Sequence, residues 1–346
     1  MKFLVTGTGG FIGRPLCKEM SHRGYQVKAA MRSHGQLSAN GETVTVGAID
    51  AGTKWADALR GVDVVIHLAA RVHVMKDKAA DPLTEFFKVN LYGTSNLAQQ
   101  AASAGVKRLV YVSSAKVNGE STAPMSTLSS DTLSPDPSPS PCKGEGEIVF
   151  AESDEPDPQD PYAISKLQAE QVLQRISHET GLEVVVVRPP LVYGPGVKGN
   201  FLRLLTAIDK GIPLPLAGAH NARSLAYVGN LVDALIACAI HPAAAGQTYL
   251  VSDGEDVSTA MLVEKIAHAL GRSSRSFYVP PGLLRTAATV LGRAEQIDRL
   301  FGSLRVNDQK LRGELGWAPP FSMEQGLRAT ADWYCTKRNG YNRGTS

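Results

Sequence analysis

The sequence predicts an α/β protein with a doubly wound parallel sheet and a smaller C-terminal lobe. Over the first two-thirds of the chain, short apolar runs alternate with helix-like stretches, a glycine-rich turn follows the first run, and the alternation loosens after Arg188. Strands that alternate with helices form βαβ units and a parallel sheet. We therefore expect residues 1–188 to form one domain around such a sheet. Residues 189–346 are expected to form mainly the smaller lobe, with segments that return to the first domain.

The expected strands lie where β-branched and other apolar residues cluster. They are Lys2–Thr6, Gln26–Ala30, Val62–Leu68, Arg108–Ser113 and Glu183–Arg188, and the expected helices include Pro15–Arg23, Leu83–Ala104 and Tyr162–Thr180. The nearly continuous apolar run from Val62 to Ile66 is typical of a strand buried on both faces. Such strands belong in the interior of a parallel sheet that helices cover.

One segment does not fit this alternation. From Ser121 to Glu147 the chain is rich in Ser, Pro and Thr and holds few residues that could form a core. This composition favours a flexible surface segment. We expect an insertion at about 121–150, with regular structure resuming near Pro156.

Composition and charge exclude several classes of protein. Of the 346 residues, 43% are hydrophobic and 20% charged, and the formal net charge of +3 is too small to argue for nucleic-acid binding. No stretch reaches the ~20 apolar residues that a membrane-spanning helix needs. A strand is expected from Lys2, which leaves no room for a signal peptide. The four cysteines lack metal-like or disulfide-framework spacing, so we expect a cytoplasmic protein without a metal site.

The glycine-rich turn predicts a dinucleotide site. Gly7, Gly10 and Gly13 follow the first expected strand and open the first helix, with Phe11 and Ile12 between them. Glycines here let the backbone turn tightly and bring a helix N-terminus close to a pyrophosphate. A glycine-rich turn without a ligand is the alternative, which the position between strand and helix disfavours.

The end of the second expected strand bears on the choice of cofactor. An acid there would bind the ribose 2′-hydroxyl of NAD, whereas a base accommodates the 2′-phosphate of NADP. The strand ends at Met31-Arg32-Ser33, without an acid, and Arg14 could add a second positive charge. The sequence therefore favours NADP(H) and leaves NAD(H) open. A merely solvated Arg32 is the alternative.

A tyrosine and a lysine lie at i and i+4 of an expected helix, so Tyr162 and Lys166 share one helix face. A free tyrosine has a pKa of about 10, and a nearby ammonium group lowers it toward the range useful for acid–base chemistry. Ser113 and Ser114 end a strand, at the sheet edge where open α/β sheets bind ligands. Tyr162 and Lys166, with a serine hydroxyl at this edge, are therefore the expected proton-transfer group.

Together these motifs resemble the extended short-chain dehydrogenase/reductase family, in its nucleotide-sugar epimerase/dehydratase branch. The resemblance spans nearly the whole chain except the Ser/Pro-rich insertion, and it implies a Rossmann sheet with a substrate-binding C-terminal lobe. The residues that carry it are Gly7/Gly10/Gly13, His67–Ala70, Asn90 within Val89–Thr94, Ser113-Ser114, Tyr162/Lys166 and Arg188–Gly196.

The resemblance implies a role for each matching residue. Tyr162 would exchange a proton with a sugar hydroxyl or ketone, Ser114 would hydrogen-bond the reacting oxygen, and Lys166 would also bind the nicotinamide ribose. The residues expected around the cofactor are Gly7, Gly10, Phe11, Ile12, Gly13, Arg32, Asp50, Leu68, Ala69, Ala70, Asn90, Tyr162, Lys166 and Pro189.

A second set of residues is expected beside a UDP-sugar, namely Lys116, Asn200, Arg223 and Arg305. An arginine suits a diphosphate because its planar fork binds two phosphate oxygens at once. Capping of a helix is the alternative role for Asn200. The family resemblance also implies a homodimer, formed through the helix at Leu83–Ala104 and the helix that starts at Tyr162.

Departures from the family pattern separate three reactions. The 4,6-dehydratases have a Thr-Asp-Glu run where this chain has Ser114-Ala115-Lys116, so the missing acids argue against dehydration. Epimerases commonly carry an acid after the second strand, where this chain has Met31-Arg32, and a reductase suits exchangeable NADPH. The segments Ala69–Met75 and Ser114–Glu120 look like those of bacterial surface-polysaccharide enzymes that act at C4 of UDP-N-acetylhexosamine derivatives.

The sequence therefore favours reduction of a UDP-4-keto-(6-deoxy)-hexosamine for polysaccharide synthesis. The alternative is a UDP-glucose/UDP-GlcNAc 4-epimerase. A remote alternative is a non-catalytic dinucleotide sensor, which the intact Tyr162/Lys166 pair disfavours.

Overall fold

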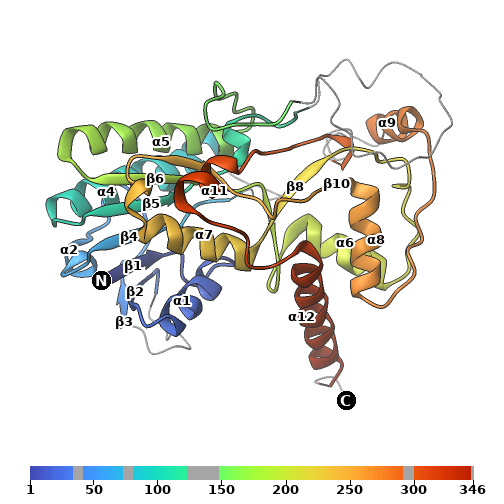
Figure 1. Ribbon diagram of the computed structural model, residues 1–346, viewed down its shortest axis with the longest axis horizontal. Helices are drawn as coiled ribbons and strands as arrows, with labels where there is room; N and C mark the ends of the chain where they lie inside the picture. Colours follow the sequence, from blue (N-terminus) through green and yellow to red (C-terminus); the bar gives the residue numbers. More distant parts are fainter. Residues whose placement is uncertain (34–41, 73–80, 123–147, 291–299, 344–346) are drawn as a thin grey trace.

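Seven parallel strands form the central sheet of the computed structural model, in the order β3-β2-β1-β4-β5-β6-β9 (Figure 1). The structure describes residues 1–33, 42–72, 81–122, 148–290 and 300–343. The strands are β1 (Lys2–Thr6), β2 (Gln26–Met31), β3 (Glu42–Thr45), β4 (Val64–His67), β5 (Arg108–Val112), β6 (Glu183–Arg188) and β9 (Thr248–Leu250). All neighbouring strands pair in parallel, so their carboxyl ends share one edge. The predicted doubly wound sheet is confirmed.

Helices cover both faces of this sheet (Figure 1). One face carries α1 (Gly13–His22), α7 (Val228–Ile240) and α11 (Gln309–Leu315), and the other carries α2 (Ala56–Leu59), α4 (Thr94–Ser103) and α5 (Pro161–Thr180). Successive residues of a strand point to opposite faces. In β6, Val185 and Val187 pack in the α1/α7 layer, and Val184 and Val186 pack in the α4/α5 layer.

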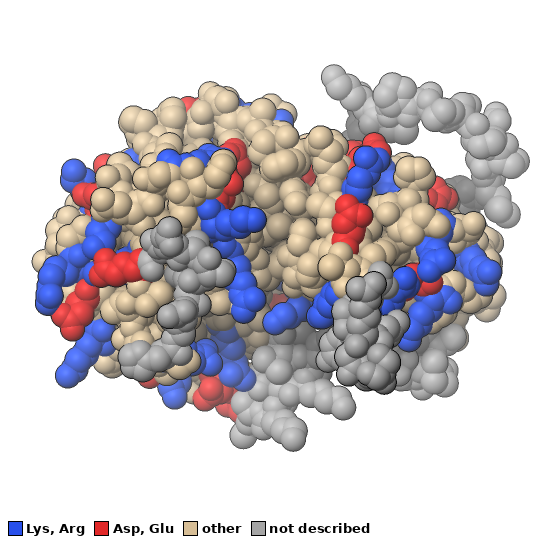
Figure 2. Space-filling view, turned by 90° about the horizontal axis from the view of Figure 1, so that it is seen from below, with Lys and Arg blue, Asp and Glu red and all other residues tan. Residues whose placement is uncertain are grey.

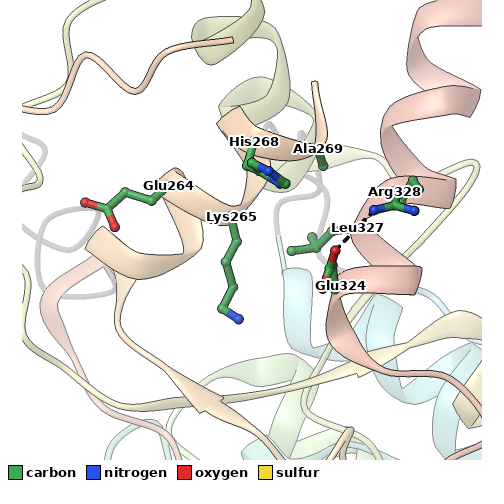
Figure 3. A pocket seen from close by; sticks show the side chains of 7 residues that line it. All are labelled: Glu264, Lys265, His268, Ala269, Glu324, Leu327 and Arg328. Atoms are coloured by element: carbon green, nitrogen blue, oxygen red, sulfur yellow. Dashed lines mark hydrogen bonds and ion pairs between the residues drawn. The ribbon is translucent and has the colours of Figure 1, made fainter. Parts of the chain in front are cut away.

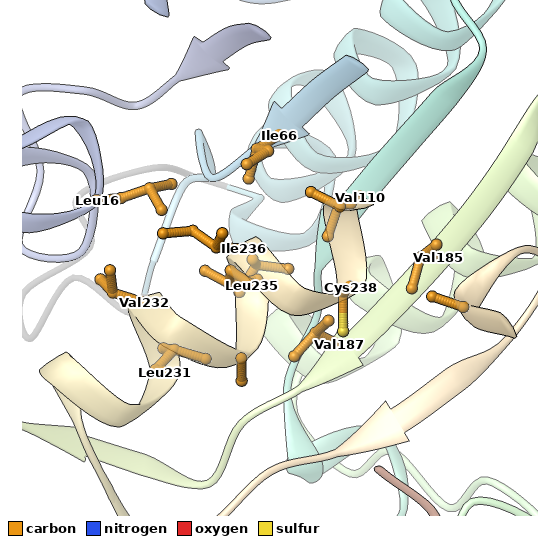
Figure 4. Close-up of a cluster of buried hydrophobic side chains, with 14 of the residues drawn as sticks. Leu16, Ile66, Val110, Val185, Val187, Leu231, Val232, Leu235, Ile236 and Cys238 are labelled. Atoms are coloured by element: carbon orange, nitrogen blue, oxygen red, sulfur yellow. The ribbon is translucent and has the colours of Figure 1, made fainter. Parts of the chain in front are cut away.

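The layer beneath the sheet is built around α7 (Figure 4). Its apolar side chains meet those of the strands and of α1: Leu231, Val232, Leu235, Ile236 and Cys238 pack with Leu16, Ile66, Val110, Val185 and Val187. The helix ends at Ile240, ahead of the short 3-10 turn Pro242–Ala244, because proline cannot continue a helix. This buried layer holds the strand ends in place.

The C-terminal lobe contains a second, three-stranded sheet in the order β10-β8-β7. Its strands are β7 (Leu191–Tyr193), β8 (Arg223–Tyr227) and β10 (Asp256–Val257), and its helices are α6 (Gly199–Asp209), α8 (Thr259–Ala269), α9 (Pro281–Val290) and α12 (Met323–Arg343). The chain crosses between the two sheets more than once, because α7, β9 and α11 return to the first sheet (Figure 1). No helix of the described residues is long and apolar enough to cross a membrane.

The single helix predicted at Leu83–Ala104 is wrong in one respect. The chain forms α3 (Pro82–Phe86), then a π-helical segment at Phe87–Gly93, then α4. At Gly93 an added Cβ would lie 2.7 Å from the Ile49 side chain, so the segment passes very close to the loop after β3. Wide turns of this kind often lie at functional sites, and this one carries Asn90.

Two strands of the central sheet were not predicted, nor were the three of the second sheet. β3 is a short edge strand of mixed polarity, and β9 is three residues long and follows the region where the alternation loosens. The Ser/Pro-rich insertion falls mainly on 123–147, outside the described residues. Its expected ends do belong to folded structure: the Thr122 N–H donates to the Ser303 carbonyl at 2.8 Å, and buried Phe150 pairs with Val306.

Candidate active site

The turn between β1 and α1 forms a backbone cradle, which side chains in place of its glycines would fill. Gly7 has φ +69°, and a Cβ there would lie 2.8 Å from the Ala69 nitrogen. A Cβ on Gly13 would collide with the Gly7 carbonyl oxygen. Gly10 donates its N–H to that same carbonyl at 2.9 Å and is exposed. The turn thus needs glycine at 7 and 13, and it leaves exposed backbone at the start of α1, where a pyrophosphate fits.

Phe11 and Ile12 connect this turn to both lobes. Both side chains are half-buried. Ile12 packs against the core beneath the first sheet, whereas Phe11 packs with the core of the C-terminal lobe. A Cβ on Gly196, in the loop after β7, would come within 3.5 Å of the Phe11 ring. The glycine turn therefore lies at the junction of the lobes.

The turn after β4 is tied to β1 and to α5. The Thr6 hydroxyl oxygen accepts from the N–H groups of Leu68 and Ala69, at 3.2 and 3.1 Å. Buried Asn90 accepts from the Arg71 N–H at 2.8 Å and donates to the Arg71 carbonyl at 3.0 Å and to the Ser165 hydroxyl at 2.9 Å. Asn90 thus clamps the segment that follows half-buried Ala70 to the helix that carries Tyr162.

His67 is a neutral structural residue in this frame. Its ring lies between the hydroxyls of Thr6 and Thr94, with Nδ1 and Nε2 at 2.7 and 3.0 Å from the two oxygens. Burial, and then the charge of Lys166, lower the pKa of His67 to about 3. The described residues contain no cluster of three or more side chains that could hold a metal ion.

Three further residues of the predicted cofactor set lie at strand ends or in loops. Arg32 is exposed just beyond β2. Asp50, in the loop before α2, accepts from the Gly52 N–H at 2.8 Å. Pro189 directly follows β6, and its carbonyl accepts from the Ala115 N–H at 2.9 Å. The structure thus places Arg32 at the carboxyl end of β2 and gives Asp50 a local turn-forming contact.

The N-terminus of α5 positions Tyr162 and Lys166. Asp160 caps the helix, because its carboxylate accepts from the Ala163 N–H at 2.7 Å, and Pro161 suits the first turn. The Lys166 ammonium is buried and donates to the Val112 carbonyl, at the end of β5, at 2.7 Å. It lies 5.9 Å from the centre of the Tyr162 ring. The predicted pair therefore does meet at the carboxyl edge of the sheet.

The expected effect of Lys166 on Tyr162 is wrong for the protein by itself. Burial raises the pKa of Tyr162, and the Asp160 carboxylate raises it further. Burial also lowers the pKa of Lys166 to about 7, with Glu170 acting in the opposite direction. Desolvation disfavours the charged form of both groups and is the largest cause of each shift.

Ser114 is the N-cap of the 3-10 segment Ala115–Val117, which contains Lys116. The Ser114 hydroxyl oxygen accepts from the Lys116 N–H at 3.3 Å, which caps the turn. The Lys116 ammonium forms ion pairs with Glu120 at 2.6 Å and with Asp160 at 2.7 Å. Lys116 thus contacts the helix cap just before Tyr162, a connection that the sequence did not reveal.

The predicted UDP-sugar residues come from the C-terminal lobe. Arg223 starts β8 and pairs with Leu304, the neighbour of Arg305. Burial lowers the pKa of Arg223, and the charge of Glu120 acts in the opposite direction. Arg305 donates to Asp256 at 2.7 Å. The structure therefore brings the two arginines onto adjacent segments, and Leu304 packs with Ala115 of the turn after Ser114. Asn200 is exposed in the first turn of α6.

A buried ion pair behind the tyrosine and lysine escaped prediction. Arg188 donates two hydrogen bonds to Glu170, at 3.1 and 2.5 Å, and a third to Asn118 at 3.1 Å. Glu170 follows Lys166 by one helical turn, a spacing that could have revealed it. Phe86 also escaped prediction: its ring meets the Tyr162 ring edge-on, with 6.1 Å between centres.

The cavity of about 380 Å³ between α8 and α12 lies away from these groups. Glu264, Lys265, His268, Ala269, Glu324, Leu327 and Arg328 line it (Figure 3). Acidic and basic side chains alternate there, and Arg328 is already paired with Glu324 at 3.1 Å. Basic and acidic side chains also intersperse on the face of the molecule seen from below (Figure 2). Neither feature competes with the strand-end site as the place of chemistry.

Known proteins resemble this chain along most of its length. A UDP-glucose 4-epimerase of Vibrio cholerae is 40% identical over 341 residues, which is 97% of this chain and 96% of the relative. A 2-alkyl-3-oxoalkanoate reductase of Stenotrophomonas maltophilia (strain K279a) is 29% identical and covers 95% of this chain and 98% of its own. A solved structure of MoeE5 in complex with UDP-glucuronic acid and NAD is 25% identical, with a TM-score of 0.73, and covers 98% of this chain and 100% of its own.

The family comparison agrees with these relatives. Residues 3–252 match the profile described as the NAD dependent epimerase/dehydratase family. This span contains the glycine turn, the Asn90 clamp, the Ser114 turn and the Tyr162/Lys166 pair, and it confirms the resemblance drawn from those motifs. The chain therefore belongs to the NAD dependent epimerase/dehydratase family.

Proposed function

We propose that the protein is a UDP-hexose 4-epimerase. The observation that carries the proposal is the 40% identity, over 97% of this chain, with the UDP-glucose 4-epimerase of Vibrio cholerae. The site agrees with it, because a single tyrosine and lysine can both remove and return a proton. The Ser114-Ala115-Lys116 turn lacks the acids that elimination of water would need.

Tyr162 carries out the proton transfer in this proposal. Its phenol oxygen takes the proton of the C4 hydroxyl as C4 becomes a ketone, and returns the proton when C4 is reduced from the other face. The Ser114 hydroxyl hydrogen-bonds the C4 oxygen of the sugar. Lys166, which the Val112 carbonyl holds in place, favours the phenolate when its ammonium is charged. Bound NAD supplies the hydride acceptor and donor, and the cradle formed by Gly7 and Gly13 is suited to hold its pyrophosphate.

The C-terminal lobe holds the nucleotide end of the sugar in this proposal. Arg223 and Arg305 lie on adjacent segments and can reach one diphosphate. Arg305 is paired with Asp256, so it would exchange a carboxylate for a phosphate oxygen on binding. Asn200, exposed at the start of α6, can add a hydrogen bond to the same group.

Direct turnover tests the proposal. The protein is incubated with UDP-glucose and NAD⁺, without a reductant, and formation of UDP-galactose is followed by NMR. Turnover by the wild type, with a ~10²-fold or greater loss in Tyr162→Phe, is expected. UDP-GlcNAc is tested in parallel. Absence of interconversion with either sugar contradicts the epimerase proposal.

A reductase is the second candidate, and one observation favours it. Arg32 stands exposed at the end of β2, without an acid beside it on the strand, which suits the 2′-phosphate of NADPH. A UDP-4-keto-6-deoxy-hexosamine is mixed with NADPH or NADH, and nicotinamide absorbance is followed. Consumption of NADPH in preference to NADH, without UDP-glucose interconversion, would make the protein a C4 reductase.

We also propose a homodimer formed through α4 and α5. The family resemblance carries this proposal, and Tyr92, in the π-helical segment that leads into α4, offers a side chain that is 51% exposed for the test. Light scattering should give twice the monomer mass, and Tyr92→Arg should shift it toward the monomer. A monomeric wild type would contradict this.

A further inference from the structure

Lys116 joins the two segments that carry the proposed catalytic group. Its backbone N–H holds the Ser114 hydroxyl at 3.3 Å, and its ammonium binds the Asp160 carboxylate at 2.7 Å. Asp160 is the N-cap of α5 and precedes Tyr162 by two residues. One side chain thus links the serine turn to the start of the tyrosine helix.

The ion pair also balances charge beside the phenol. The Asp160 carboxylate opposes ionisation of Tyr162, in the same direction as burial. Burial by itself raises the pKa of Asp160. The ion pair with Lys116 and the hydrogen bond from the Ala163 N–H outweigh burial and lower this pKa, so the carboxylate stays charged. The Lys116 ammonium lies between Asp160 and a second carboxylate, that of Glu120. Without Lys116, the Asp160 carboxylate beside the phenol would lose its ion-pair partner.

We propose that Lys116 is a positioning residue, whose ammonium locks the Ser114 turn to the cap of α5 and offsets the Asp160 charge at Tyr162. This role rests on the proposed proton transfer by Tyr162. It replaces the expectation that Lys116 serves chiefly to bind the sugar, because its ammonium already has two carboxylate partners at 2.6 and 2.7 Å.

Other charged or titratable groups lie around the phenol, and the charged ones have partners of their own. On α5 they are Lys166 and Glu170, on β5 Tyr111, and beyond the Phe86 ring Arg71 and Glu85. Lys166 binds the Val112 carbonyl, and Glu170 binds Arg188. Arg71 lies over Phe86, 5.7 Å from its centre. Lys116 is therefore the cation placed to act on Asp160.

The pH dependence of turnover tests this role. Removal of the proton from C4–OH needs the phenolate, so kcat/KM rises with pH through an apparent midpoint. Lys116→Met should raise that midpoint by about one pH unit, and so lower the rate about tenfold below it. Lys116→Arg, which keeps the charge, should restore the wild-type midpoint. Asp160→Asn keeps a capping side chain but removes the charge, and should lower the midpoint.

The double variant separates charge from structure. In the Asp160→Asn background, Lys116→Met should move the midpoint by less than half of its effect in the wild type. A lower kcat with an unmoved midpoint would show a structural role only and overturn the proposal. An equal shift in both backgrounds would overturn the route through Asp160.

A second readout keeps this test independent of the epimerase proposal. If the wild type does not turn over UDP-glucose, Tyr162 is titrated in NAD⁺-saturated protein by tyrosinate absorbance, as the difference from the matching Tyr162→Phe variant. Lys116→Met should raise the titration midpoint there as well. An unchanged midpoint rejects the role of Lys116, whereas absent turnover with a raised midpoint rejects only the epimerase.

Discussion

Replacing Lys166 with methionine should stabilise the cofactor-free protein at neutral pH, by an amount that shrinks as the pH rises. The ammonium is 2% exposed, and burial lowers its pKa from 10.5 to about 7. In the unfolded chain the group returns to its ordinary value. Between about pH 7 and 10.5 the unfolded state therefore binds a proton that the folded state does not.

The magnitude follows from those two values. The gap between 10.5 and about 7, at ~1.4 kcal/mol for each pH unit, gives a cost of about 5 kcal/mol below pH 7. Because the unfolded state binds more protons, the stability of the wild type rises with pH across this window. About 2 kcal/mol of the cost should disappear between about pH 7 and 9. Methionine has a similar length and does not titrate, so the variant lacks this slope.

Urea unfolding, followed by tryptophan fluorescence at several pH values, gives both free energies of unfolding. The difference between Lys166→Met and wild type should fall by about 2 kcal/mol from about pH 7 to 9. Lys18→Met is the control, because Lys18 is exposed on α1 and has water around it in both states. A difference that stays constant with pH for Lys166→Met would refute the argument from burial.

Two other substitutions test the frame of the site. Gly13→Ala should weaken NADH binding at least about tenfold in a fluorescence titration, because the added Cβ meets backbone atoms and such overpacking costs ~1–3 kcal/mol. Gly9→Ala is the control and should bind NADH normally, because a Cβ on Gly9 has nothing within 4 Å. Glu170→Ala should lower the free energy of unfolding by about 3–5 kcal/mol, because it leaves the buried charge of Arg188 without its carboxylate. Glu324→Ala removes the carboxylate of an exposed ion pair and should lower the free energy of unfolding by less than about 1 kcal/mol. Equal losses in the two members of either pair would contradict the assigned contacts.

The parts of the molecule that depend on local backbone could be predicted from the sequence. Gly7 and Gly13 are needed because the turn is tight and neighbouring backbone approaches both residues closely. Glycines at this spacing can be recognised in the sequence alone. The bounds of α5 follow from a capping aspartate, Pro161 in the first turn, and Gly181 with φ +78° at its end. The buried strands were predictable because a parallel sheet covered on both faces requires nearly continuous apolar runs.

Contacts between distant segments could not be predicted in this way. Asn90 was expected beside the cofactor. Its hydrogen bonds to Arg71 and Ser165 depend on a π-helical turn, which the spacing of residues in the sequence does not predict. The spacing of Glu170 places it one helical turn after Lys166, but its pairing with Arg188 depends on the packing of α5 on β6, which buries both charges. The edge strand β3 was missed because an exposed strand of mixed polarity lacks the apolar run on which the prediction depended.

The direction in which the pKa of Tyr162 is shifted could not be predicted from the spacing of the motif. Spacing revealed that a lysine neighbours the tyrosine, and Coulomb attraction alone would favour the phenolate. Burial acts on both partners and disfavours both charges, and the cap carboxylate of Asp160 adds a repulsion that no motif contains. The two contributions can be measured apart: Lys166→Met reports the cost of burying the ammonium, and Lys116→Met reports the charge of Asp160 at the phenol. If Lys116→Met leaves the titration midpoint unchanged, the Asp160 charge does not set the proton affinity of Tyr162, and Lys116 merely holds the turn in place.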